Sequence, residues 1–449
     1  MKRYRDKVID LFRNTDKFSH QAATVVGWTA ISQIIMFLGI PFVSRIFTPE
    51  AFGVYAVYAA VIYILNGVVS LGCELLIPNP SSDEEGATLF WVSIINLLLV
   101  TIVISILLLI SNYTAVWETL NLTALSHYQW LIVFGAVAIG LRNCLLYWFT
   151  RIRRFNQVGK ARFLQAPVIV FVQVGVGYLY PHPDVLIIGG VLSWLISDIY
   201  LLMKLDGEQR KLLRQGQATQ YFSVLQSNKA FFSHTTSSLF LLNLSNYLPT
   251  ILFAISFDPA VAALYALAYQ AFSPLDLISN AIIQLYIGEG NRIVRNHPLQ
   301  LKTFYKKMLV GLSLITIVPI TIAAIWGGPI FGFVFGAKWY HAGVYAQIMA
   351  FAMMMRFVVI AASQNLAVLK KQGLNLAWSS IYIVLILAAF IPANLLAGFT
   401  KAEYTIVLLS CMMMLSYFIL VLLNFGVIHR QIPNYVGSNN NGFREQAES

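Results

Sequence analysis

Charged residues are scarce in this chain. Asp, Glu, Lys and Arg make up 11% of its 449 residues, whereas 58% are hydrophobic and the mean hydropathy is +0.71. Soluble domains usually carry about 25% charged residues. The composition therefore excludes a soluble globular protein and indicates a chain that lies largely within a membrane.

Cysteine is also scarce, and the short motifs of catalysis are absent. Cys73, Cys144 and Cys411 have no paired spacing, so we expect neither a disulfide framework nor a metal site. The sequence contains no G-x-x-x-x-G-K-[ST] loop, no H-E-x-x-H motif and no nucleophile elbow. We therefore predict a protein with no catalytic residues and no cofactor, which is not an enzyme and does not hydrolyse ATP on its own.

Long apolar segments dominate what is present. There are twelve of them, each near or above the ~20 residues that a helix needs to cross a bilayer. The segments are residues 22–44, 51–77, 87–111, 129–150, 163–180, 185–203, 231–257, 259–287, 308–326, 342–369, 375–397 and 403–428. We therefore predict twelve transmembrane helices.

The distribution of Lys and Arg predicts how these segments are oriented. With both termini in the cytoplasm, 25 of the 30 Lys and Arg fall in cytoplasmic segments, 3 in the opposite loops and 2 within spans. Short loops follow this positive-inside bias. Loops that face anionic lipids also account for the net charge of +11, so we expect no nucleic-acid partner.

The polar segments divide the chain into two halves of six spans. We predict a cytoplasmic N-terminal segment (1–21), an N-lobe (22–204), a cytoplasmic linker (205–229), a C-lobe (230–428) and a cytoplasmic tail (429–449). The halves repeat weakly, since Arg142 aligns with Arg356 and Gly159 with Gly373 at one offset. An even number of spans in each half predicts parallel repeats, an arrangement in which transporters bind substrate near the midplane.

Two arginines lie within predicted spans, Arg142 in the fourth and Arg356 in the tenth. A charge at that depth costs at least ~2.5–3.5 kcal/mol on insertion scales, so it normally faces a protein interior or an aqueous cavity. Guanidinium groups bind phosphate oxygens in pairs, and we interpret both residues as contacts for an anionic head group. Arg45, at the end of the first span, is a further substrate-binding candidate. Alternatively, each buried arginine is a counter-ion to a nearby acid or caps a helix kink.

Three acids are candidates for ion coupling. Asp276 lies just after Pro274 near the middle of the eighth span, where a lone carboxylate suits a proton or sodium site. Asp198 in the sixth span and Glu74 near the inner end of the second are weaker candidates. Alternatively, Asp276 is a structural partner to one of the arginines. A proton or sodium gradient is the energy source that we expect.

Residues 44–55 (SRIFTPEAFGVY) resemble the first-loop signature of bacterial polysaccharide flippases of the O-antigen translocase (Wzx) type. That family belongs to the multidrug/oligosaccharidyl-lipid/polysaccharide exporter superfamily. The similarity continues in residues 71–75, in residues 263–284 and in residues 335–339. Asp276 departs from the pattern, because a small or hydroxylated residue is expected there.

The resemblance implies an all-α polytopic membrane protein with two six-helix lobes (MATE-like) around a central cavity. It implies a flippase that moves an undecaprenyl-diphosphate-linked oligosaccharide repeat unit across the bacterial inner membrane by alternating access, for O-antigen, capsule or exopolysaccharide synthesis. The implied partners are this substrate and membrane lipids, together with a polysaccharide polymerase and a chain-length regulator. Two alternatives stay open: a cation-coupled multidrug exporter of the same fold, and a polysaccharide polymerase or ligase, which the short external loops disfavour.

Overall fold

The computed structural model describes residues 2–395 and 402–447. The regular structure in these residues is helical, without a strand. The chain divides into two compact units, Met1–Asn243 (the N-unit) and Leu244–Ser449 (the C-unit). The division falls within one helix, α12, and the predicted linker at residues 205–229 belongs to the N-unit.

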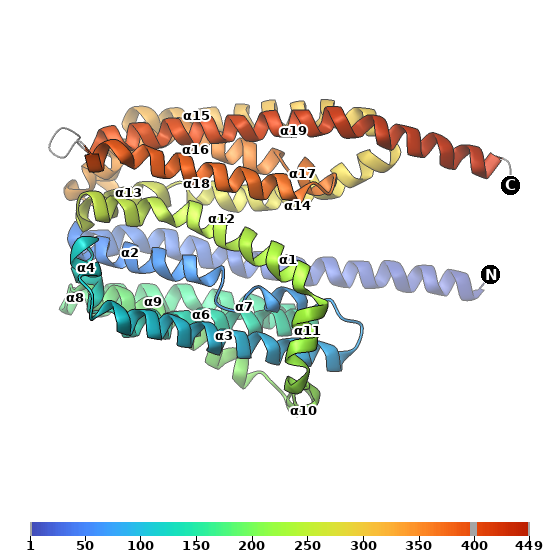
Figure 1. Ribbon diagram of the computed structural model, residues 1–449, viewed down its shortest axis with the longest axis horizontal. Coiled ribbons are helices and arrows are strands. Elements are labelled where there is room, and N and C mark those ends of the chain that lie inside the picture. The colour runs from blue at the N-terminus through green and yellow to red at the C-terminus, as the bar shows by residue number, and fades with distance from the viewer. Residues whose placement is uncertain (1, 396–401, 448–449) are drawn as a thin grey trace. The chain divides into compact units, whose positions relative to one another are not determined.

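In the N-unit, long helices run side by side and short turns join their ends (Figure 1). Its elements are α1 (Lys2–Ile46), α2 (Pro49–Asn66), η1 (Cys73–Leu76), α3 (Asp83–Ser111), α4 (Val116–Thr119), α5 (Thr123–Ser126), α6 (Gln129–Arg151), α7 (Phe155–Phe171), the π-helical turn η2 (Val172–Val176), α8 (Gly177–Leu179), α9 (Pro183–Met203), α10 (Gly207–Gln215), η3 (Ala218–Gln220), α11 (Tyr221–Ser227) and most of α12 (Lys229–Ser256). Helices α6, α7 and α9 pack against one another at the centre of this unit.

The C-unit has the same construction. It contains the end of α12, α13 (Pro259–Gln270), α14 (Ser273–Asn296), η4 (Pro298–Gln300), α15 (Leu301–Phe335), η5 (Ala337–Trp339), α16 (Tyr340–Ala362), α17 (Asn365–Val368), α18 (Gln372–Leu395) and α19 (Ala402–Ala447). Helix α16 packs against α13, α14, α15 and α19, and so lies at the centre of the unit.

Local signals set where several helices begin. The side chains of Thr48, Ser82 and Asp258 accept the N–H groups of Ala51, Glu85 and Val261, which satisfies donors that a helix start leaves free. Proline follows directly in α2 and α13, where its missing N–H costs nothing. These caps begin the helices at the borders between polar and apolar sequence.

The described residues contain eleven helices that are long and apolar enough to cross a membrane, or twelve if the bent pair α13–α14 counts as one span. This agrees with the twelve spans predicted from hydropathy. The protein is therefore a multi-pass membrane protein.

The prediction of a continuous second span over 51–77 is wrong in its second half. Helix α2 ends at Asn66, and turns follow in which Leu71 and Gly72 have φ values of 54° and 70°. A Cβ on Gly67 would lie 3.0 Å from the Leu239 oxygen of α12, so this close approach requires glycine. The Thr236 hydroxyl of α12 donates to the Leu71 carbonyl at 2.6 Å. Contact with α12 thus replaces backbone bonds that a helix would have supplied.

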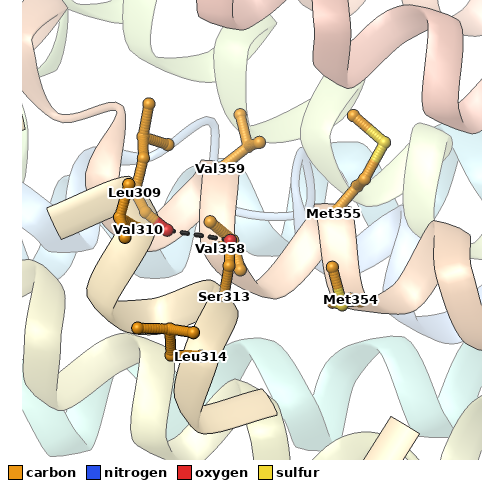
Figure 2. Close-up of a pocket in the computed structure, with 8 residues that line it drawn as sticks. All are labelled: Leu309, Val310, Ser313, Leu314, Met354, Met355, Val358 and Val359. Carbon is orange, nitrogen blue, oxygen red and sulfur yellow. Dashed lines mark hydrogen bonds between the residues drawn. The ribbon is translucent and has the colours of Figure 1, made fainter. Parts of the chain in front are cut away.

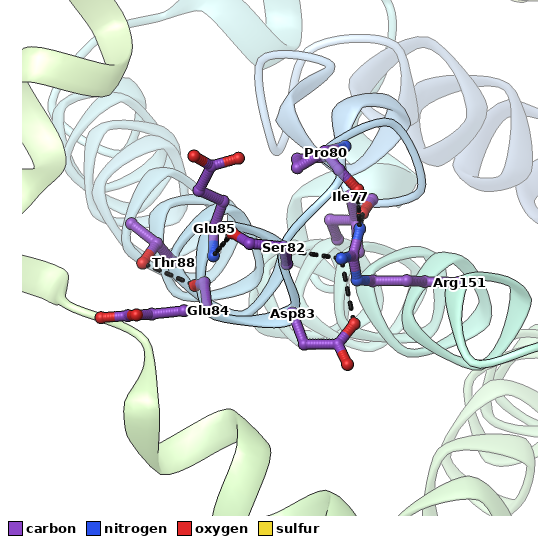
Figure 3. A network of polar contacts seen from close by, with 8 residues as sticks. All are labelled: Ile77, Pro80, Ser82, Asp83, Glu84, Glu85, Thr88 and Arg151. Atoms are coloured by element: carbon purple, nitrogen blue, oxygen red, sulfur yellow. Dashed lines mark hydrogen bonds and ion pairs between the residues drawn. The ribbon is translucent and has the colours of Figure 1, made fainter.

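One end of the N-unit gathers segments that are all predicted to be cytoplasmic. The Arg151 side chain, 6% exposed, donates to the carbonyls of Ile77, Pro80 and Ser82 and pairs with Asp83 (Figure 3). This arginine therefore ties the end of α6 to the loop between η1 and α3.

The linker joins the same end. Arg154 forms an ion pair with Asp206, which caps α10 by accepting the Gln209 N–H at 2.9 Å. That backbone bond, together with Arg154, lowers the pKa of the Asp206 carboxyl. The Trp91 indole of α3 donates to the Leu213 carbonyl at 2.8 Å, which holds α10 against α3.

The opposite end of the N-unit joins segments predicted to lie outside. Tyr128 donates to Asp184 at 2.6 Å, and the side-chain amides of Gln129 and Asn112 are hydrogen-bonded. Loops therefore alternate between the two ends of this unit in the order that the sequence predicts.

Candidate functional site

Arg142 lies near the middle of α6 and is held by neutral groups. Its Nη1 donates to the Gln165 Oε1 of α7 at 2.7 Å, and its guanidinium lies 5.8 Å from the centre of the Trp194 ring of α9. Tyr63 of α2 packs edge-on against the same indole at 6.3 Å between ring centres. The buried Arg142 Nε has no hydrogen-bond partner among the described residues. This cation therefore keeps unused donor capacity inside a membrane span.

The residues around Arg142 form one cluster, which consists of Arg142, Tyr63, Gln165, Trp194 and Asp198. Within this cluster, Asp198 does not pair directly with Arg142 in the described structure. It lies one turn after Trp194 on α9, is 2% exposed, and neither carboxylate oxygen has a hydrogen-bond partner in the described part of the chain. Its neighbour Ser197 accepts from Gln165 at 3.3 Å, so Gln165 bridges Arg142 to this turn of α9. A buried carboxylate is normally compensated by a cation or a proton, and the ion-coupling role of Asp198 stays a prediction.

Arg356 on α16 has a charged partner. It forms an ion pair with Asp276 of α14, and the two side chains are 13% and 39% exposed. Its guanidinium also lies 5.3 Å from the centre of the Tyr269 ring of α13. The structure thus brings together two residues that the sequence assigned to different roles, substrate binding and ion coupling.

Buried aromatic side chains surround this pair. Tyr382 of α18 and Tyr417 of α19 are both buried, and their rings lie 5.7 Å apart. Trp378 stacks on Tyr382 at 5.7 Å and donates from its indole to the Ser416 carbonyl at 2.8 Å. These neighbours hold the rings in place around the ion pair.

The remaining candidates lie in other segments. Glu74, in η1, is 4% exposed and accepts from the Ser70 hydroxyl at 2.6 Å. Arg45 is exposed in the last turn of α1, near the connection to α2. Neither location tests the roles predicted for these residues.

Sequence reasoning missed several residues of both clusters. Gln165, Trp194, Tyr269, Tyr382 and Tyr417 are uncharged, so a search for charges within spans could not find them. The available signal was spacing, because Tyr265 and Tyr269, and likewise Trp378 and Tyr382, recur at four residues and share a helix face. Among the described residues, no group of three or more His, Cys, Asp or Glu side chains could hold a metal ion.

Comparisons with known proteins agree with this architecture. The model of a family described as "Polysaccharide biosynthesis protein" matches residues 42–344. A search of curated protein sequences finds no match.

Solved structures of transporters share the fold. The chain is similar to an inward-facing multidrug resistance MATE family transporter of the MOP superfamily, with TM-score 0.67 and 12% identity over 90% of this chain and 96% of that one. It is similar to the lipid II flippase MurJ in an inward closed conformation, with TM-score 0.63 and 12% identity over 92% and 90%. A eukaryotic MATE transporter gives TM-score 0.55 and 12% identity over 94% and 99%. At such low identity the likeness shows the fold alone, which is that of transporters and flippases.

Proposed function

This chain belongs to the polysaccharide biosynthesis protein family, and we propose that it is a flippase for a lipid-linked oligosaccharide. The cargo would be a repeat unit on undecaprenyl diphosphate, moved from the cytoplasmic to the periplasmic face of the bacterial inner membrane. Family membership supports the saccharide, and the transporter fold supports translocation rather than catalysis. The excess of Lys and Arg on one side supports cytoplasmic termini.

The observation that carries this proposal is the environment of Arg142. A guanidinium has five N–H donors, and among the described residues only Nη1 bonds to a side chain, that of the neutral Gln165. A diphosphate supplies the oxygen acceptors that such a fork prefers. A cationic drug would be repelled by the same group, so the environment favours an anionic cargo over the multidrug alternative.

Arg356 would act differently, because Asp276 already neutralises it. We infer that a substrate anion competes with Asp276 for Arg356, and that the displaced carboxylate then accepts the coupling ion, a proton or sodium. Asp198 is the second candidate for this ion. A membrane potential contributes ~2.3 kcal/mol per charge per 100 mV, enough to bias such an exchange.

The test is to analyse lipid-linked sugars and their membrane sidedness in cells that lack the gene. We expect complete repeat units to accumulate at the cytoplasmic face and the wild-type gene to clear them. Arg142→Ala should lower transport by about 10–100-fold, since a hydrogen bond to a charged group contributes about 1.5–3 kcal/mol. Lys211→Ala, which removes an exposed cation from α10, is the matched control and should transport normally.

Three outcomes would overturn the proposal. Wild-type transport by the Arg142→Ala, Arg356→Ala double variant, at a normal level in the membrane, would remove the arginines from the mechanism. Unchanged lipid intermediates together with new drug sensitivity would identify a multidrug exporter instead. Single repeat units that reach the outer face in cells without the gene but stay unpolymerised would indicate that this protein is the polymerase.

A further inference from the structure

A cavity of about 690 Å³ opens between the last turns of α14 and the first turns of α15 in the C-unit. Arg292 and Asn296 line it from α14, and Gln300, Thr303 and Lys307 line it from the segment that begins α15. The buried Ile293 and the partly buried Phe304 add an apolar surface. This is a polar cavity with one apolar wall.

The charge of the cavity is close to +1. Arg292 and Glu289 form a bidentate ion pair, with Nε–Oε2 at 2.9 Å, so these two lining residues largely cancel. Lys307 is exposed and forms no ion pair with an acid in the described part of the chain, which leaves one uncompensated cation. A single phosphodiester, with its charge of −1, would complement it better than a diphosphate.

A separate apolar groove lies farther along α15. Its volume is about 320 Å³, and it is lined by Leu309, Val310, Ser313 and Leu314 of α15 together with Met354, Met355, Val358 and Val359 of α16 (Figure 2). The only polar side chain among them, Ser313, donates to the Leu309 carbonyl of its own helix at 2.8 Å. The groove therefore suits an apolar ligand.

The two features share one stripe of α15. Thr303, Lys307, Val310 and Leu314 recur at intervals of four, three and four residues, which places them on one helix face. From Lys307 to Leu314 the helix rises by about 10 Å. Val310 and Leu314 are 60% and 65% exposed in a helix that is long and apolar enough to cross a membrane. Along α15 a polar residue, then a cation and then an exposed apolar groove thus follow one another, as the polar head and apolar chain of a lipid do.

We propose that this cavity and groove bind an anionic phospholipid of the cytoplasmic leaflet, with its phosphate at Lys307 and one acyl chain along α15. The loop between α14 and α15 is predicted to be cytoplasmic, and that leaflet carries the anionic lipids. The proposal does not depend on the flippase function, because the cavity and the groove do not include the residues on which that function is argued.

Binding of dioctanoyl phosphatidylglycerol to the full-length protein in a neutral detergent, measured by titration calorimetry, tests the site. We expect tighter binding than for dioctanoyl phosphatidylcholine. Lys307→Ala should weaken binding about fivefold, the change that corresponds to about 1 kcal/mol for one basic residue near a lipid surface. Lys302→Ala removes an equally exposed lysine of α15 that does not line the cavity, and should leave binding unchanged.

Two further variants separate ligand binding from loss of fold. Glu289→Gln removes the carboxylate that neutralises Arg292, so it should tighten binding. Ser313→Phe fills the groove and should weaken binding of the lipid but not of glycerol phosphate. Equal affinity for both lipids, or equal losses in Lys302→Ala and Lys307→Ala, would overturn the proposal. A preference for undecaprenyl diphosphate over phosphatidylglycerol would overturn the assignment to a phospholipid.

Discussion

At the scale of single residues, two arginines at corresponding places in the chain differ in what holds them. Arg142 donates to the neutral Gln165, whereas Arg356 pairs with the charged Asp276. Asp198, on the same helix as Trp194, has no hydrogen bond to either carboxylate oxygen in the described structure. Arg142 thus keeps an unbonded Nε among the described residues, whereas Arg356 is held in an ion pair.

The Arg356–Asp276 pair should couple energetically. We expect Asp276→Asn and Arg356→Gln each to lower the free energy of unfolding by about 1–3 kcal/mol, less than for a fully buried pair because Asp276 is 39% exposed. The double variant should lose less than the sum, since it leaves no unpaired charge. Unfolding in detergent would measure this cycle.

The matched control for that cycle is the pair Arg292–Glu289, whose side chains are 66% and 37% exposed. Breaking it should change stability by less than about 1 kcal/mol. Strictly additive losses at Arg356 and Asp276 would contradict the coupling.

At the scale of elements, spans are interrupted where other groups satisfy the backbone. The turns after α2 are supported by Thr236 of α12, and the loop before α3 is supported by Arg151. Helix α13 likewise gives way to α14 with a bend of 44° close to Pro274. Such breaks are tolerated within a membrane protein only where neighbouring protein replaces the missing bonds.

Arg151 should therefore be needed for the stability of the N-unit. Arg151→Ala leaves the carbonyls of Ile77, Pro80 and Ser82 without their donor, and we expect a loss of about 2–4 kcal/mol, or several degrees of melting temperature. Arg151→Lys should recover only part of it, because an ammonium group cannot reproduce the planar fork. A melting temperature equal to that of Lys211→Ala would show that the network is dispensable.

At the scale of the whole molecule, the loops of each unit lie at its two ends. In the C-unit, Tyr286 of α14 donates to Asn365 beside α17 at 2.9 Å, and Tyr305 of α15 bonds with Ser363 at 3.2 Å. All these segments border loops predicted to be cytoplasmic. At its other end, Gln347 of α16 donates to the carbonyls of Ala324 and Ile325 of α15, next to the loop at residues 327–341 that is predicted to lie outside. This alternation requires the number of crossings that hydropathy predicts.

Labelling of single cysteines in a variant without Cys73, Cys144 and Cys411 would establish the orientation. We expect Tyr113→Cys, at a 92% exposed position, to react with an impermeant maleimide in intact cells. Lys302→Cys should react only after the membrane is opened, because basic loops stay in the cytoplasm. The reverse pattern would place the termini outside.

The sequence by itself determined the membrane class, the helical fold, the number of spans and the positions of the buried charges. Each of these follows from local composition, since the cost of placing polar groups in lipid is set residue by residue. Only the tertiary structure decided that Asp276 pairs with Arg356, that Gln165 holds Arg142, and that α2 stops at Asn66. These depend on which helices pack together, and neither the rotation of a helix about its axis nor its neighbours can be read from hydropathy.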